Sequence, residues 1–403
     1  MIQLAKSAIF WAAALLLVLA ACGDPAASQP GQEALSMEWN ELKEISRGTE
    51  VHMYMWGGDE GINRYIDEFA APELKEKHDI ELIRHPMNTE DFMSKLLTEK
   101  KANKSEGTID IIWINGENFR NAKENDLLLG SFIDILPNYN RYVDKTLPYV
   151  SKDMGIPIDG MEAPWGKVQF VFHYDSDKVD APPTTFEELA EWIHSNPGQF
   201  TYPAANDFTG NAFVRHLIYE FATELDSLSD IDEFDYQEEI WSYLNEIKPD
   251  LWRKGETYPG SLSELDRLYS QGEVAFTMGF NEGRVASLIE DGTFPDTTKS
   301  LVIEPGSIGN AHYLSIPFNS PNASGALAAI NFFMSPQAQI AKANPALWGE
   351  GTIIDLEKLS EQQVKNLKDF TGTSVVKPQD VLQELHTDYT DWIRESWEDE
   401  VLR

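Results

Sequence analysis

Cysteine is nearly absent from this chain. The only one among the 403 residues is Cys22, which directly follows an apolar run from Ala8 to Ala21. One early lysine, Lys6, precedes that run, which is too short to span a bilayer and suits the hydrophobic core of a signal peptide. We therefore predict that residues 1–21 are removed on export. Neither disulfides nor thiolate metal sites are then expected in the mature fold.

The residues before the cysteine, Leu19-Ala20-Ala21-Cys22, resemble the bacterial lipobox, in which a signal peptidase cuts before a cysteine that carries diacylglycerol. This resemblance implies that Cys22 is lipidated; the alternative is an ordinary secretory signal that happens to end in cysteine. Residues 22–47 are charged and contain Ser, Gly and Pro, which predicts a tether. No second apolar run reaches about 18 residues, so we expect membrane contact only through the N-terminal lipid and a periplasmic or other extracytoplasmic location.

Basic residues are scarce. The chain has 32 Lys and Arg against 67 Asp and Glu, a formal net charge of −35 at pH 7. Such a charge repels nucleic acid and anionic lipid, so we expect no nucleic-acid partner. Hydrophobic residues make up 42% of the chain, enough for a large core, which assigns the acidity to a folded surface. Two interpretations stay open: adaptation to a saline medium, and a field that concentrates a cationic ligand.

Sequence motifs of catalysis are also missing. The eight histidines form no H-E-x-x-H or other close pair with the spacing of metal ligands. No G-x-S-x-G elbow, phosphate-binding loop or G-x-G-x-x-G fingerprint occurs either. We therefore predict no metal, no cofactor and no enzymatic activity. The alternative is a secreted carbohydrate-active or other carboxylate-dependent enzyme, because two acids can meet from anywhere in a fold.

What the chain does contain is a regular alternation of strand and helix patterns. Apolar strand patterns fall at Val51–Met55, Ile80–Arg84 and Ile109–Ile114, and a helical period over Thr89–Lys101 separates the last two. Strands that alternate with helices predict an α/β fold with a mainly parallel sheet, in which ligands bind beyond the carboxyl ends of the strands. The roughly 355 residues after the tether imply two domains.

Aromatic, polar and glycine residues gather where the predicted strands end. The first strand ends in Trp56-Gly57-Gly58-Asp59 and the third in Asn115-Gly116-Glu117-Asn118. Later, the strand Val274–Met278 ends in Gly279-Phe280-Asn281. The pair Asn206-Asp207 can cap a helix, whose free N–H groups would then point at a ligand. These four places are the candidate ligand contacts.

Three tryptophans each allow two interpretations. Trp165 lies between a proline and a glycine, which favours an extended crossing between two lobes over a plain β-turn with a packed ring. Trp56 and Trp165 stand beside glycines, where a flat ring can stack on a ligand, but either ring could belong to the core instead. For Trp113, inside an apolar strand, we favour the core.

The order of these motifs resembles family 1 extracellular solute-binding proteins of ABC importers. The resemblance spans about Val51 to Gly349 and includes two later motifs, Gly272-Glu273-Val274-Ala275-Phe276 and Phe332-Phe333-Met334-Ser335-Pro336-Gln337-Ala338-Gln339. More narrowly, the chain is similar to the YnjB-like subgroup in four segments: Trp56–Asp59, Asp110–Phe119, Gly160–Gly166 and Asp207–Gly210.

The family resemblance implies a two-lobed α/β fold of the type II periplasmic-binding-protein class, with three hinge crossings and a ligand cleft between the lobes. One lobe would comprise residues 48–162 and 303–318, the other residues 163–302 and 319–403. The resemblance further implies a monomer that delivers a small-molecule solute to ABC permease subunits. Its ligand contacts, at strand ends and the hinge, correspond here to Trp56, Gly57, Gly58, Asp59, Asn115, Glu117, Asn118, Trp165, Asn206, Gly279, Phe280 and Asn281.

The residue types at these positions bear on the solute. Aromatic residues beside acids favour a cationic or heteroaromatic solute, such as a thiamine-like compound or a polyamine. A sugar is the next candidate, since sugars also stack on tryptophan and form hydrogen bonds with Asn and Asp. Ferric iron is disfavoured, because the adjacent tyrosine pair typical of the family's iron binders does not occur in this sequence.

Overall fold

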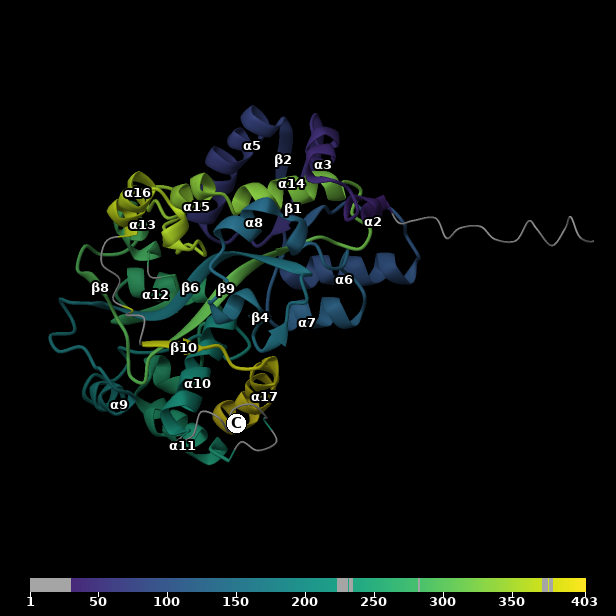
Figure 1. Ribbon diagram of the computed structural model, residues 1–403. Helices are drawn as coiled ribbons and strands as arrows, with labels where there is room; N and C mark the ends of the chain where they lie inside the picture. The colour runs from purple at the N-terminus through teal and green to yellow at the C-terminus, as the bar shows by residue number, and fades with distance from the viewer. Residues whose placement is uncertain (1–29, 223–230, 232–234, 282, 372–375, 377–379) are drawn as a thin grey trace, which may run out of the picture.

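A computed structural model shows a mixed α/β fold and describes residues 30–222, 231, 235–281, 283–371, 376 and 380–403 (Figure 1). The predicted signal peptide, residues 1–21, and the predicted lipidation site, Cys22, lie outside the described residues. Within the described part of the chain, no helix combines the length and the apolar character needed to cross a membrane.

Eight strands form one sheet that runs through both halves of the molecule. β2, β1 and β3 are parallel, β9 and β6 follow in antiparallel orientation, and β7 and β8 pair with the far end of β6. The strand bounds are β1 Thr49–Met55, β2 Ile80–Pro86, β3 Ile111–Ile114, β6 Glu162–Asp175, β7 Phe276–Phe280, β8 Thr298–Leu301, β9 Ser307–Ser315 and β10 Val381–Gln383, with a separate hairpin of β4 Lys152–Asp153 and β5 Ile156–Pro157. The sheet is thus mixed: β2, β1 and β3 are parallel, β10 also pairs with β9 in parallel, and the other pairs are antiparallel.

Two groups of helices surround this sheet, and β6 and β9 run between them (Figure 1). The upper group, which includes α5 and α14, lies around β1 and β2, and the lower group, which includes α10 and α11, lies below β10. The helix bounds are α2 Pro30–Ala34, α3 Trp39–Ile45, α4 Glu60–Arg64, α5 Ala71–His78, α6 Thr89–Lys101, α7 Glu117–Glu124, α8 Pro137–Tyr142, α9 Phe186–Ser195, α10 Phe208–Phe221, α11 Gln237–Ile247, α12 Leu262–Ser270, α13 Arg284–Glu290, α14 Ala323–Phe333, α15 Pro336–Lys342, α16 Glu361–Thr371 and α17 Thr387–Trp397.

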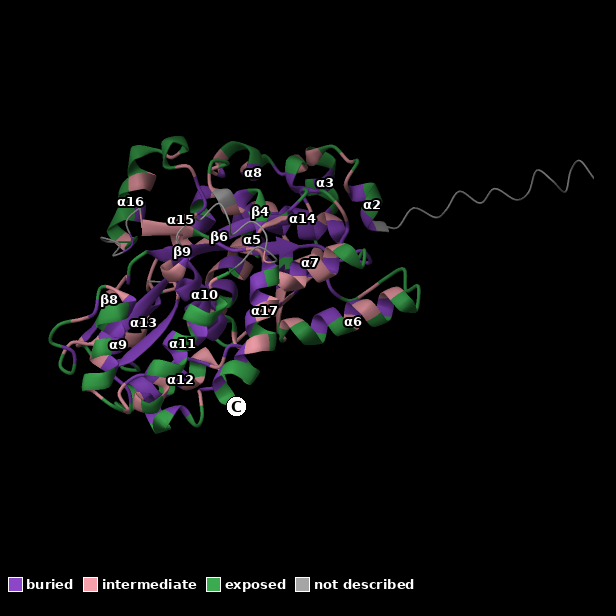
Figure 2. Cartoon of the chain, turned by 90° about the horizontal axis from the view of Figure 1, so that it is seen from below, coloured by how far each residue is buried: buried purple, intermediate pink, exposed green. Residues whose placement is uncertain are grey.

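Each half has its own hydrophobic core. Val51 and Ile112 belong to one cluster of buried residues, and Phe172 and Phe213 to another. Figure 2 shows the buried residues concentrated along the strands and on the inner sides of the helices. Two cores joined by β6 and β9 give the two-lobed arrangement that the family resemblance implied.

The C-terminal part of the chain differs from our expected lobe boundaries. We expected residues 319–403 to belong to the second lobe, but the buried residues of α14, together with Ile353, belong to the first core. α14 follows the Asn322 cap and approaches β1 so closely that a Cβ on Gly325 would lie 2.8 Å from Val51 Cγ2. Only later residues, including Ile393 of α17, belong to the second core.

The predicted tether also differs from the structure. We expected residues 22–47 to form a tether, but α2 and α3 are helical and contribute to the first core, where Ala34 is 2% and Leu42 0% exposed. These apolar side chains pack near α14, and their burial favours folded helices over a free linker. Residues 30–47 are therefore part of the folded first lobe, and the rest of the predicted tether lies outside the described residues.

Candidate functional site

The segment 344–351, which follows α15, contacts both lobes. The carbonyl oxygen of Ala346 accepts a hydrogen bond of 2.8 Å from Arg64 Nη1 in α4. The backbone of Gly349 lies against the loop after β7, where a Cβ on Gly283 would stand only 1.9 Å from the Gly349 oxygen. The Lys167 N–H of the crossing strand β6 donates to Gly351 O at 3.3 Å. One segment therefore joins the ends of β1 and β7 to the hinge.

The loop after β1 presents an exposed ring beside a carboxylate. Trp56 is 42% exposed, and its ring folds over Gly58, where a Cβ would lie 2.3 Å from Trp56 Cζ2. The Asp59 carboxylate accepts a 2.9 Å hydrogen bond from the Ile62 N–H and so caps α4. Gly57 accepts a 2.9 Å bond from Asn63 Nδ2, which ties the loop to the same helix. A side chain at position 58 would therefore have to move the Trp56 ring from this position.

The opposite lobe presents a matching loop after β7. Phe280 lies 5.1 Å from Phe208, measured between ring centroids, and Phe208 is 42% exposed at the first position of α10. Asn281 has a positive φ of 76° and accepts a 3.0 Å hydrogen bond from the Gly283 N–H. Asn206 is exposed, and Asp207 caps α10 by accepting from the N–H groups of the two residues after Phe208. An aromatic pair and a helix N-terminus thus lie together on this side.

Carboxyl groups dominate the electrostatics between the two loops. Burial raises the pKa of Asp266. The charge of Arg284 and the hydrogen bonds from Thr277 and Arg284 act against this shift, and the negative charge of Asp59 on the other lobe adds to it. Burial also raises the pKa of Asp207, although its two capping N–H groups act in the opposite direction. Arg284 therefore offsets part of the cost of burying Asp266, while backbone N–H groups do so for Asp207.

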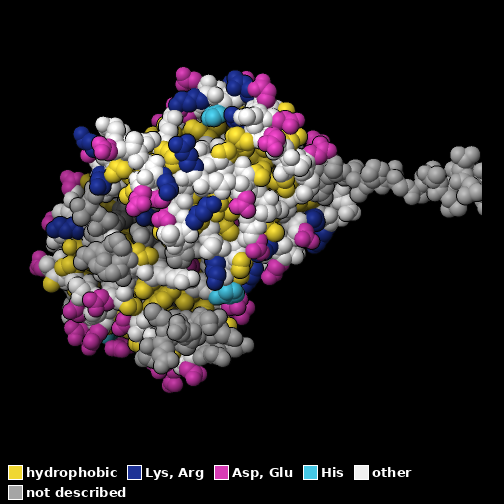
Figure 3. Space-filling model, in the orientation of Figure 1, with side chains coloured by type: hydrophobic (Ala, Val, Ile, Leu, Met, Phe, Trp, Pro, Cys, Tyr) yellow, Lys and Arg dark blue, Asp and Glu magenta, His cyan; other side chains and the backbone are white. Residues whose placement is uncertain are grey.

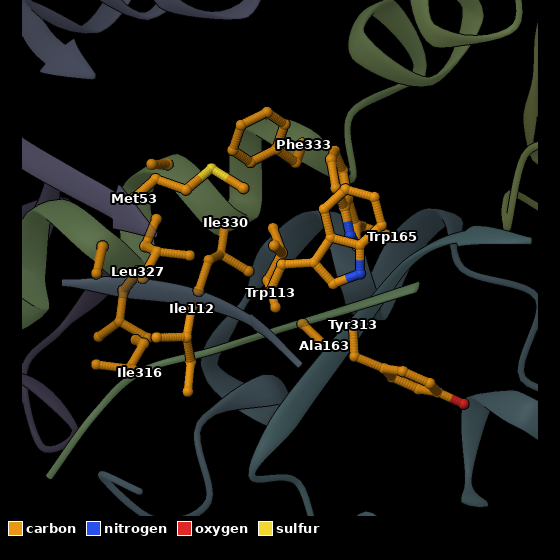
Figure 4. Packing of buried hydrophobic residues seen from close by; sticks show 14 of the residues in the cluster. Met53, Ile112, Trp113, Ala163, Trp165, Tyr313, Ile316, Leu327, Ile330 and Phe333 are labelled. Carbon is orange, nitrogen blue, oxygen red and sulfur yellow. The ribbon is translucent and has the colours of Figure 1, made fainter. Parts of the chain in front are cut away.

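A cluster of tryptophans is buried in the first core around Trp165 of β6. Trp165 lies 5.4 Å from Trp113 and 5.2 Å from Trp348, measured between ring centroids. Figure 4 shows Trp113 and Trp165 side by side below Phe333. Trp165 is 0% exposed, and its indole Nε1 has no hydrogen-bond partner among the described residues. Its ring is therefore a core element in this arrangement of the lobes.

A buried ion pair lies next to these tryptophans, because Lys342 Nζ is 5.8 Å from the Trp165 ring centroid and 5.3 Å from that of Trp348. Lys342 Nζ lies 2.8 Å from Glu350 Oε1 and also 2.8 Å from the carbonyl oxygen of Gly351. The second carboxylate oxygen lies 2.8 Å from His312 Nδ1 on β9, and the His312 ring stacks on Trp348 at an interplanar angle of 6°. Burial lowers the pKa of Lys342, and Glu350 opposes this shift. The pair ties segment 344–351 to α15, and the His312 contact ties it to β9.

The loop after β3 faces a different neighbour. The Gly116 N–H donates to the Asp153 carboxylate of β4, and a Cβ on Gly116 would lie 2.5 Å from Met154 Sδ. Glu117 begins α7, and its Oε2 pairs with Arg394 Nη1 at 2.7 Å. Asn115 and Asn118 are half-buried beside it. The structure therefore places Glu117 against α17 of the second lobe instead of against segment 344–351.

The sequence interpretation missed several residues of this site: Phe208, Asp266, Arg284, His312, Lys342, Trp348 and Glu350. Two of them carried a usable signal. Phe208 directly follows the predicted cap Asp207, and Trp348 precedes Gly349, the same aromatic-glycine pattern that identified Trp56. Among the described residues, no group of three or more His, Cys, Asp or Glu side chains is arranged to hold a metal ion.

Comparison with known proteins identifies the class. A family model described as bacterial extracellular solute-binding protein matches residues 65–371. The chain belongs to this family, so the predicted family and the two-lobed fold are confirmed, and an extracytoplasmic location follows from the class.

Particular relatives support this assignment. Protein YnjB of Escherichia coli K12 is 35% identical over 369 residues, which cover 89% of this chain and 93% of YnjB. The substrate-binding protein PotD of a spermidine/putrescine ABC transporter from Streptococcus pneumoniae is 17% identical, with a TM-score of 0.62 over 87% of this chain and 99% of PotD. A periplasmic thiamin binding protein is 15% identical, with a TM-score of 0.60 over 88% of this chain and 96% of that protein. These structural likenesses concern the fold.

Proposed function

We propose that this protein is a lipid-anchored binding protein that captures a cationic or heteroaromatic solute between its lobes and delivers it unchanged to ABC permease subunits. The observation that carries the proposal is the pairing of exposed aromatic rings with carboxyl groups on both lobes. Trp56 stands beside Asp59 on one lobe, and Phe208 beside Asp207 on the other. Aromatic faces attract cations, and carboxylates supply the opposite charge.

The relatives are consistent with such a solute. One structural relative is named for spermidine and putrescine, and another for thiamin, all of which carry positive charge. The proposed contacts are the loops after β1 and β7, Asn206 and Phe208. Trp165 would not itself contact the solute in this arrangement of the lobes, because its ring is fully buried.

A thermal-shift screen of the chain without residues 1–21 tests the solute class. Thiamine, spermidine, putrescine and maltose are compared at equal concentration, because a ligand that binds only the folded state must raise the Tm. We expect thiamine or a polyamine to raise the Tm saturably and to be recovered intact. A shift with maltose alone would contradict the cationic solute, and consumption of the ligand would indicate an enzyme.

Two substitutions test the aromatic contacts. Trp56→Ala and Phe208→Ala should each weaken binding of the solute found in the screen by ~1–3 kcal/mol, measured by calorimetric titration. Leu356→Ala is the matched control, since Leu356 is similarly exposed, at 44%, and belongs to neither loop. Unchanged affinity in both aromatic variants would place the solute elsewhere.

A further inference from the structure

Arginine side chains connect the two lobes along one flank. α7 contributes Phe119 and Ala122 to the first core, whereas α17 contributes Tyr389 and Ile393 to the second. Contacts between α7 and α17 are therefore contacts between lobes. They lie apart from segment 344–351.

The contacts form one connected network of alternating charge. Arg120 of α7 pairs with Asp388 at 3.0 Å and with Asp391 at 2.7 Å. In the reverse direction, Arg394 of α17 pairs with Glu117 at 2.7 Å and approaches Asp391 within its own helix at 3.5 Å. We call these five residues the α7–α17 network. Each lobe contributes at least one arginine and one carboxylate to it.

The Arg120 guanidinium is held in a fixed orientation. Besides the two aspartates, its Nη1 donates a 2.7 Å hydrogen bond to Thr387 Oγ1 at the first position of α17. Its side chain is 18% exposed, while the Asp388 side chain is 49% exposed. A partly buried arginine with several partners contributes more than an isolated surface pair, but the exposed partners leave the network open to salt screening.

The overall charge of the chain makes these arginines important for the relation between the lobes. With 67 acidic against 32 basic residues, approach of one lobe to the other generally brings like charges together. Figure 3 shows acidic and basic side chains interspersed over the upper lobe, with acidic ones at the lower left edge. Without the positive charges of Arg120 and Arg394, Glu117 of α7 would face Asp388 and Asp391 of α17, and these three negative charges would repel one another.

We propose that the α7–α17 network is a salt-sensitive latch that holds the lobes in the arrangement described, independently of which solute binds. In the described part of the chain, the side-chain hydrogen bonds and ion pairs of these residues join α7 to α17 and involve neither solute loop, so the latch acts through the population of this arrangement of the lobes. Apparent affinity for a solute scales with the fraction of molecules already in the binding-competent state. The latch therefore sets how tightly a given solute is held at a given ionic strength.

Single-molecule energy transfer between dyes on the two lobes tests this. Glu76→Cys on α5 and Glu191→Cys on α9 are exposed labelling positions, and Cys22→Ser leaves them as the only thiols. In the solute-free protein, Arg120→Gln with Arg394→Gln should lower the ratio of closed to open molecules about 5- to 30-fold. Raising NaCl from about 0.05 M to about 1 M should lower the same ratio in the parent protein and change it little in the double variant.

Arg84→Gln is the matched control. Arg84 makes a comparable double contact with Asp67, through Nε at 2.9 Å and Nη2 at 2.6 Å, but both residues belong to the first lobe. This variant should leave the energy-transfer distribution unchanged. An equal shift with Arg84→Gln would mean that the loss of any positive charge has this effect, which would overturn the latch. An unchanged distribution in the double variant, with circular dichroism showing it folded, would also overturn it.

Discussion

Replacing Lys342 with methionine tests the buried ion pair that fixes segment 344–351. Both side chains of the Lys342–Glu350 pair are 0% exposed, and their charged atoms are 2.8 Å apart. Methionine is close to lysine in length and volume, so the substitution leaves little empty space. The loss of stability should therefore come from the charge of Glu350 and the Gly351 carbonyl, which both lose their donor.

The expected magnitude follows from this burial. Breaking a buried pair by removing one partner costs about 3–5 kcal/mol, because the remaining charge stays desolvated and unpaired. His312 Nδ1 lies 2.8 Å from the second Glu350 oxygen and remains beside the carboxylate in this variant. We expect the free energy of unfolding to fall by about 3–5 kcal/mol.

Equilibrium unfolding in urea measures this change as a shift of the midpoint at constant slope. Lys75→Met is the control, because Lys75 makes a 2.9 Å pair with Asp79 on the surface of α5, and its loss should be barely measurable. Adding Glu350→Gln to Lys342→Met should recover part of the loss. If Lys342→Met costs no more than Lys75→Met, the reasoning from burial is refuted.

Further predictions concern other parts of the chain. Trp165→Ala should lower the free energy of unfolding by about 3–5 kcal/mol in urea, since it empties a fully buried ring position; a small loss would place the ring outside the core. Burial raises the pKa of Glu162, so the folded state keeps a proton that the unfolded state releases above about pH 4, and stability falls as the pH rises. Glu162→Gln should therefore raise the Tm at pH 8 and hardly change it at pH 3. For Glu99 burial acts upward, but hydrogen bonds from Lys104, Asn319 and Lys95 lower the pKa to about 2, so its contribution is present above about pH 4 and lost as the pH falls toward 2. Glu99→Gln should lower the Tm at pH 7 and have little effect at pH 2, the opposite trend to Glu162→Gln. Cys22→Ser should move the protein from the membrane fraction to the soluble fraction of cells; unchanged membrane association would contradict the lipid anchor.

Local rules predicted much of the fold and part of the site. The alternation in Val51–Met55 matches β1, where alternate side chains are buried. The predicted strand at 274–278 overlaps β7 and begins two residues before it. Asp207 caps α10 as expected, because capping depends on a single residue and the N–H groups that follow it. The glycine turn after the first strand also lies where the pattern indicated.

Contacts between distant segments could not be predicted in this way. Lys342 and Glu350 meet only because segment 344–351 folds back on α15, and neither residue differs in sequence from a solvated surface charge. Glu117 follows a predicted strand end, where we expected a ligand contact. In the structure it pairs instead with Arg394, which is 277 residues further along the chain. The lobe membership of α14 depends on the approach of Gly325 to Val51, which no periodicity encodes.

The order in which the first core is assembled has a consequence for biosynthesis. This core takes residues from Ala34 through Ile353, so its last buried side chains leave the ribosome after most of the chain has been made. β1 to β3 are thus synthesised long before α14 can cover them. Because domains fold as units, the N-terminal segments must wait, exposed to chaperones, for their C-terminal partners. The first core therefore cannot be complete until most of the chain has been synthesised.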